Sequence, residues 1–129
     1  MQRKPKTIIE KYLEKDKENF ELYKFLSQNN KFLGWQGVSI FYASLCYVKA
    51  YLCAKGIDNE AIRTHQTIME WLTMEEDAKR LMILDRFYNL LYCYSRDARY
   101  KCTTFSQAKV DKMLSYYEGI KKELIIPKM

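Results

Sequence analysis

The sequence predicts an all-α fold, an up-down antiparallel bundle of four long helices plus one short helix. Two observations lead to this prediction. The chain of 129 residues contains only four glycines and two prolines, too few for the many turns of a β-sandwich or barrel. Its longest apolar segment, residues 34–55, repeats apolar side chains at intervals of three and four, as one face of a helix does. The length suits one domain spanning residues 1–129.

The segment 34–55 is the predicted centre of the bundle. Its apolar side chains cover most of the helix circumference, which is typical of a helix buried in a bundle or in a membrane. Hydroxyl, amide and tyrosine side chains interrupt the apolar run, so we interpret it as a core helix and expect no membrane association. The apolar positions are Trp35, Val38, Phe41, Tyr42, Leu45, Cys46, Val48, Ala50, Tyr51, Leu52 and Cys53.

Caps and breaks mark the flanking helices. Residues 7–28 form an amphipathic helix that Gly34 and the asparagines before it are expected to separate from the central helix. Gly56 is expected to end the central helix, because glycine accepts the left-handed conformation there. Thr64 is a predicted N-cap of the short helix.

Two further caps are predicted for the last two helices. Thr73 and Glu76 have the spacing of a capping box, and the helix after them is expected to end at residue 97 or 98. A short link follows, Ser106 caps the last helix, and Pro127 ends it.

The net charge of +6 is unevenly distributed along the chain. Positive charge is in excess in residues 1–31 and 96–129, whereas residues 58–89 are acidic on balance. This distribution permits an anionic partner such as RNA, and solvated surface lysines explain it equally well. Charge alone leaves both interpretations open.

Several classes of site lack the residues that they need. The four cysteines form no Cys-x-x-Cys pair and His65 is the only histidine, so we expect no metal site and no cofactor. Neither a glycine-rich phosphate loop nor a nucleophile elbow occurs. The first residues lack the apolar core of a secretory signal, and the cysteine usage suits a reducing compartment. We therefore expect a cytoplasmic protein.

One segment, residues 90–102, combines cations with tyrosines near the expected end of a helix. Guanidinium groups bind phosphates bidentately, and tyrosine rings stack on bases. Cations at this position also satisfy the last carbonyls of a helix and its dipole, which is the alternative interpretation. The candidate anion-binding residues are Arg96, Arg99, Tyr100 and Lys101.

The order of these features resembles the HEPN (higher eukaryotes and prokaryotes nucleotide-binding) domain over about residues 8–124. The matching pieces are the central FYASLCYVKAYLCAKGI, the helix opening at Thr64-His65, the segment LYCYSRDARY and the helix after Phe105-Ser106. The resemblance implies a helical bundle, often a homodimer. It also implies a toxin–antitoxin, phage-defence or CRISPR-associated setting, with a nucleotidyltransferase-type partner protein.

The resemblance also bears on catalysis. Active ribonucleases of the family carry an arginine followed, after four to six residues, by a histidine. Arg96 matches the arginine, but Lys101, Cys102 and Thr103 stand where the histidine would be. Lysine, with an ordinary pKa of about 10.4, is a poor replacement for an imidazole base.

We therefore expect a non-catalytic module that binds a nucleotide, RNA or a partner protein. One alternative is an atypical, metal-independent ribonuclease in which Arg96 stabilises the phosphate and Tyr100 or His65 transfers the proton. Another is a purely structural dimeric scaffold or antitoxin subunit in which the cations only cap a helix.

Overall fold

The computed structural model describes residues 7–28, 31–74, 78–100 and 105–126, including side chains except those of residues 78–86 and 100. Within these ranges the protein contains helices and no strand, so the all-α prediction is confirmed. The elements are α1 (Ile8–Ser27), α2 (Leu33–Ala54), the 3-10 helix η1 (Asn59–Ile62), α3 (His65–Thr73), α4 (Ala78–Tyr100) and α5 (Gln107–Glu123). As predicted, four of the α-helices are long, and α3 is short with nine residues.

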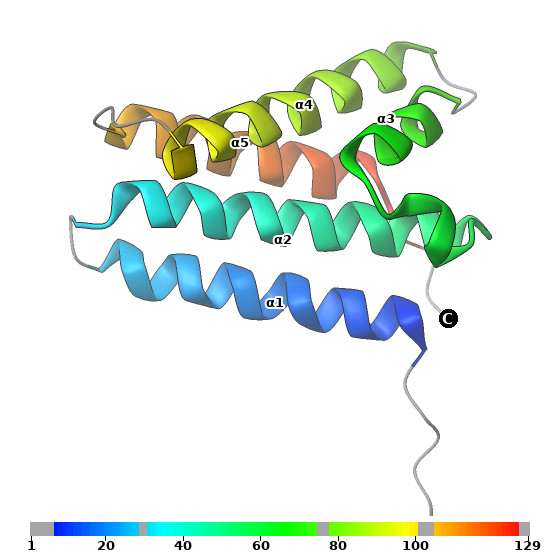
Figure 1. The fold of residues 1–129 in the computed structure, drawn as a ribbon, viewed down its shortest axis with the longest axis horizontal. Helices are drawn as coiled ribbons and strands as arrows, with labels where there is room; N and C mark the ends of the chain where they lie inside the picture. Colours follow the sequence, from blue (N-terminus) through cyan, green and yellow to red (C-terminus); the bar gives the residue numbers. More distant parts are fainter. Residues whose placement is uncertain (1–6, 29–30, 75–77, 101–104, 127–129) are drawn as a thin grey trace, which may run out of the picture.

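The helix α2 lies in the middle of the bundle. Figure 1 shows α1 along one side of it and α4 and α5 along the other, and α2 contacts all three of these helices. The short elements η1 and α3 cover one end of α2, and α3 also contacts α4. Side chains from three directions therefore meet on α2.

Burial follows from this central position. Ile40, Val48 and Leu52 of α2 are completely inaccessible to solvent. Among the described residues α2 is the one helix long and apolar enough to cross a membrane. Of its apolar stretch of 18 residues, 67% is buried within the fold. Its apolar side chains thus have protein partners, as expected for the core helix of a bundle.

Two side chains of α2 depart from the prediction of an apolar stripe facing the core. Trp35 is 63% exposed and Tyr42 is 36% exposed. The spacing placed them on the stripe correctly, but the other helices do not cover them. Both of these side chains border cavities described below.

The predicted caps at Thr64, Ser106 and Gly56 are confirmed, and the structure adds one at Thr7 that was not predicted. The hydroxyls of Thr7, Thr64 and Ser106 each accept a hydrogen bond from the backbone N–H three residues later. Gly56 follows the C-cap Lys55 with φ of +93°, a conformation that glycine adopts without steric cost.

The boundaries differ from the predictions at three helix ends. The helix α5 ends at Glu123, before Pro127, which lies outside the described residues. The predicted capping box of Thr73 and Glu76 stays a prediction, because Glu76 lies outside the described residues; Thr73 is the last residue of α3, and its hydroxyl donates to the carbonyl of Glu70. Gly34 does not separate α1 from α2 but lies in the first turn of α2, and Phe32 takes the left-handed conformation before it, with φ of +61°. The helix α4 continues to Tyr100, two or three residues beyond the expected end at residue 97 or 98.

Candidate functional site

A cluster of aromatic rings fills the space between α2, α3 and α4. The ring of Phe41 lies 6.1 Å from that of Tyr88 and 5.9 Å from that of Tyr92. The imidazole of His65, in the first turn of α3, stacks on Tyr92 with ring centres 3.6 Å apart and an angle of 10° between the planes. The cluster brings together residues that are far apart in the sequence.

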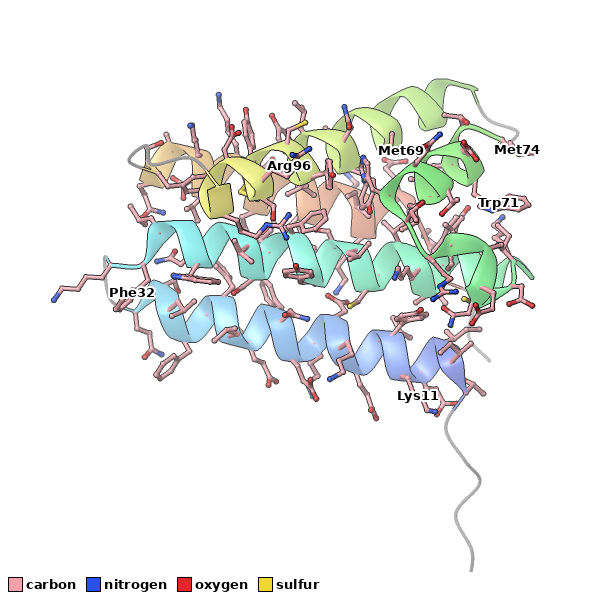
Figure 2. The ribbon with its side chains drawn as sticks, in the orientation of Figure 1. Lys11, Phe32, Met69, Trp71, Met74 and Arg96 are labelled. Carbon is pink, nitrogen blue, oxygen red and sulfur yellow. The ribbon has the colours of Figure 1, made fainter. Side chains whose placement is uncertain are left out.

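The guanidinium of Arg96 extends this stack toward the surface. Its Cζ atom lies 5.8 Å from the centre of the Tyr92 ring, within the range of a cation–π contact. Arg96 is exposed, and Figure 2 shows it on the last part of α4. Tyr92 therefore contacts both the imidazole of His65 and the guanidinium of Arg96.

Beside these rings is a cavity of about 320 Å³, which we call the cationic cavity. Its walls combine aromatic rings with three cationic side chains, and no carboxylate occurs among its described lining residues. Such a surface favours a ligand that has both a planar ring and negative charge. The lining residues are Phe41, Tyr42, Leu45, Lys49, Arg63, Thr64, His65, Ile68, Tyr88, Tyr92 and Arg99.

Two neighbours orient the guanidinium of Arg99. Its Nε donates to the carbonyl of Ser95, one turn earlier in α4, over 3.3 Å. Its Nη1 donates to the hydroxyl of Tyr42 on α2 over 3.0 Å, and its Cζ lies 5.8 Å from the centre of that ring. The first of these bonds stays within α4, on a carbonyl that precedes the last turn, and the second directs the cation toward α2.

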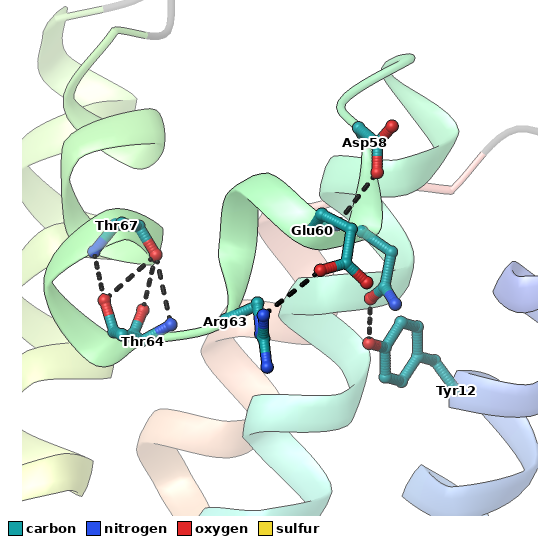
Figure 3. A network of polar contacts seen from close by, with 7 residues as sticks. Tyr12, Asp58, Glu60, Arg63, Thr64 and Thr67 are labelled. Carbon is teal, nitrogen blue, oxygen red and sulfur yellow. Dashed lines mark hydrogen bonds and ion pairs between the residues drawn. The ribbon is translucent and has the colours of Figure 1, made fainter.

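Arg63 and Lys49 belong to different elements. Figure 3 shows Arg63 at the junction of η1 and α3, where its Nη1 lies 3.3 Å from the Oε2 of Glu60. This ion pair is solvent-exposed on both sides and therefore contributes little to stability. On α2, the Nζ of Lys49 lies 5.7 Å from the centre of the Tyr12 ring.

Next to Arg63, Thr64 is held by a reciprocal capping box. Its hydroxyl accepts from the N–H of Thr67, whose hydroxyl in turn accepts from the N–H of Thr64 (Figure 3). This cap fixes the first turn of α3, which carries His65 into the aromatic cluster.

Tyr88, one of the lining residues of the cationic cavity, has a buried hydroxyl. The residue is fully buried, and its hydroxyl has no hydrogen-bond partner within the described part of the chain. Burial raises the pKa of Tyr88, so the phenol stays protonated and remains a donor at physiological pH. A buried polar group in this state is costly unless something else bonds to it.

The four site residues predicted from the sequence lie in different places relative to the cationic cavity. Arg99 lines the cationic cavity, whereas Arg96 lies at its edge against Tyr92. Tyr100 is the last residue of α4, but its side chain is not described. Lys101 lies outside the described residues.

Three lining residues, Tyr42, Lys49 and Arg63, were not predicted as site residues from the sequence. One observation pointed to Lys49. Together with Lys55, it is one of the two charged residues in the segment 34–55, and it lies seven residues from Tyr42, on the same helix face. Nothing in the local sequence marks Arg63, because only the path of η1 brings it to the cavity.

No metal-binding site is evident in the part of the chain that the structure describes. No three histidine, cysteine, aspartate or glutamate side chains there come together as ligands.

No family model, no curated protein and no solved structure matches the chain.

Proposed function

We propose that this helical bundle is an up-down bundle of the HEPN kind that binds a nucleotide, free or as a unit of RNA, in the cationic cavity without cleaving it. One observation carries the proposal. Lys49, Arg63 and Arg99, from three separate elements, converge on one cavity with several aromatic rings and no described carboxylate in its lining. Arginine and lysine hold phosphate oxygens, and the rings offer a surface for a base.

Convergence matters more here than the number of cations. Lys49 and Arg99 are half-buried and Arg63 is exposed, and these three like charges repel one another where they line one cavity, although solvent weakens the repulsion. Binding of an anion relieves that repulsion. Tyr88 also lines this cavity and has a buried hydroxyl that is unbonded within the described residues.

The test measures nucleotide binding by calorimetry at low salt. Wild-type protein should bind adenosine 5′-monophosphate, and Arg99→Gln should weaken this binding by about tenfold or more, because hydrogen bonds to charged groups contribute about 1.5–3 kcal/mol. The affinity should fall as salt is added, since ions screen the partly exposed charges.

A matched control comes from α1. Lys24 is also a cation beside an aromatic ring, with its Nζ 5.4 Å from the centre of Phe20, but it does not line the cavity. Lys24→Gln should therefore leave binding unchanged. The proposal fails if the wild-type protein binds neither mononucleotides nor RNA, or if Lys24→Gln and Arg99→Gln weaken binding equally.

A second candidate function, an atypical ribonuclease, rests on the His65–Tyr92–Arg96 arrangement. Histidine is the commonest general base, and arginine stabilises charge that develops on a phosphate. An imidazole and a guanidinium contact the same Tyr92 ring, although the histidine comes from α3 instead of following the arginine in sequence.

This candidate has its own test. End-labelled RNA is incubated with the wild-type protein and with the His65→Ala and Arg96→Ala variants in the presence of a metal chelator. Cleavage by the wild type that is lost in both variants would replace the non-catalytic proposal with the ribonuclease. Intact RNA in all three reactions would rule the ribonuclease out.

A further inference from the structure

A second cavity lies next to the cationic cavity. Its volume is about 310 Å³, and it is lined by Gly34, Trp35, Val38, Ala98 and Arg99. We call it the Trp35 cavity. The indole of Trp35 is 63% exposed, although tryptophan is among the side chains that gain most from burial. An exposed indole beside a cavity is a surface on which another flat ring can stack.

The two cavities are linked through Arg99, which lines both of them. Its bond to the hydroxyl of Tyr42 places the guanidinium beside a residue that lines the cationic cavity. Trp35 and Tyr42 lie seven residues apart on one face of α2, so they are separated by about 10 Å along the helix axis. A cation thus lies at the junction of two cavities, each of which has aromatic surface.

This alternation of ring, cation and ring matches the covalent repeat of a nucleic acid strand, in which one phosphate joins two nucleosides. We propose that the two cavities hold consecutive nucleotides of a single-stranded RNA. Arg99 binds the phosphate between them, and the base of the second nucleotide stacks on Trp35. The inference rests on the proposed function and specifies its ligand as a strand of at least two nucleotides.

Charge and chemistry favour this occupant over an apolar one. Arg99 is a cation in a wall otherwise made of Gly34, Trp35, Val38 and Ala98, and a wholly apolar partner would leave its charge desolvated. A nucleotide offers a phosphate to the cation and a ring to the indole. Stacking of bases on aromatic side chains is also tolerant of sequence.

The experiment compares a mononucleotide, pA, with the dinucleotide pApA. The wild-type protein should bind pApA about tenfold more tightly than pA, which is the typical contribution of one base stacked on an aromatic residue. Trp35→Ala and Trp35→Leu should remove this difference and leave pA binding unchanged. Trp35→Phe should retain most of it, because the ring is kept.

The control variant is Phe25→Ala, which removes an aromatic side chain of similar exposure, 65%, that lines neither cavity. It should bind pA and pApA as the wild type does. Trp35 and Trp71 are the two tryptophans of the chain. In the Trp71→Phe background, pApA should therefore quench the remaining indole fluorescence, and pA should leave it unchanged.

Three results would overturn the inference: equal affinities of the wild-type protein for pA and pApA, weakened pA binding in Trp35→Ala, or indole fluorescence unaffected by pApA. A lower oligomeric mass of Trp35→Ala in light scattering would also overturn it, because the indole would then be covered by a second copy of the chain. If pA itself does not bind to the wild type, the proposed function fails. If pA binds and pApA gains nothing, only the two-cavity inference fails.

Discussion

The hydroxyl of Tyr117 on α5 donates a hydrogen bond of 2.6 Å to the Oδ1 of Asp16 on α1, 101 residues away in the sequence. Asp16 is only 4% exposed, and the Nζ of Lys121 lies 3.6 Å from its Oδ2. Burial raises the pKa of Asp16, although the bond from Tyr117 and the charge of Lys121 act in the opposite direction. This buried carboxylate joins the first helix of the bundle to the last.

Removal of the acceptor at Asp16 is expected to destabilise the protein. Asp16→Ala leaves the buried hydroxyl of Tyr117 without its partner, which should lower the free energy of unfolding by about 1–3 kcal/mol. Asp16→Asn retains an oxygen acceptor and removes the buried charge, so it should cost less. Urea unfolding monitored by circular dichroism checks both values, and an equal loss in the two variants would contradict this account.

The raised pKa of Asp16 also predicts a pH dependence. The folded protein holds this proton to higher pH than the unfolded chain does, where the ordinary value is 3.8. The contribution of Asp16 to stability is therefore greatest below that value and is lost as pH rises through the folded-state pKa. The stability of the wild type relative to Asp16→Asn should fall over this interval. A difference that rises with pH in paired urea titrations would show that the carboxylate is stabilised in the fold.

Tyr88→Phe should weaken nucleotide binding without lowering the stability of the protein. The variant removes a buried hydroxyl that is unbonded within the described residues, so the free protein should be as stable as the wild type or more stable by up to about 1 kcal/mol. Nucleotide affinity should decrease about threefold to tenfold if the hydroxyl donates to the ligand. Tyr94→Phe, on the same helix but outside the cavity lining, serves as the control and should bind normally.

Gly34 and Gly37 of α2 should respond differently to alanine. A Cβ atom at Gly37 would lie 2.9 Å from the Sδ of Met113 and 3.0 Å from the ring of Phe105, both buried. At Gly34 the nearest atom would be 3.7 Å away, which is an ordinary contact. Thermal unfolding should therefore show Gly34→Ala stabilised by about 0.5 kcal/mol, since the unfolded chain loses freedom. Gly37→Ala should be destabilised by about 1 kcal/mol or more. The same sign for both variants would contradict the close approach at Gly37.

The cysteines should differ in their reaction with iodoacetamide. Burial raises the pKa of Cys46 to about 11, so only about one molecule in a thousand carries the reactive thiolate at pH 8. Cys93 is exposed on α4. Peptide mapping after short exposure should find Cys93 alkylated at least tenfold faster than Cys46, and unfolding in urea should remove the difference. Equal rates in the folded protein would contradict the raised pKa of Cys46, because this partly buried thiol would then form its thiolate as readily as Cys93.

Much of the helical architecture was predictable from the sequence, because its determinants act over one or two turns. Thr7, Thr64 and Ser106 cap helices through bonds to N–H groups three residues away. The expected end of α4 was less accurate, since cations and tyrosines after residue 97 suggest a link yet also fit a last helical turn. Extension of the helix to Tyr100 places Arg99 on a regular turn, one turn after Ser95.

The cationic cavity was only partly predictable. Arg96 and Arg99 are three residues apart and lie near each other on α4, so the sequence could not show which of the two lines the cavity. Arg99 lines the cavity because it reaches α2, where Tyr42 accepts a hydrogen bond from it. Likewise, helical spacing assigned Trp35 to an apolar face but contained no information on whether another helix covers it.

By itself, the sequence determined that this chain forms helices, that α2 is their centre and where most of them begin. Those properties depend on apolar spacing and on hydrogen bonds between close neighbours in the chain. The tertiary structure alone decided that Lys49, Arg63 and Arg99 share one cavity and that the Trp35 indole remains exposed beside it. The physical reason is that such contacts join residues on different elements, and they exist only after the packing of η1, α3 and α4 around α2 has set which side chains meet.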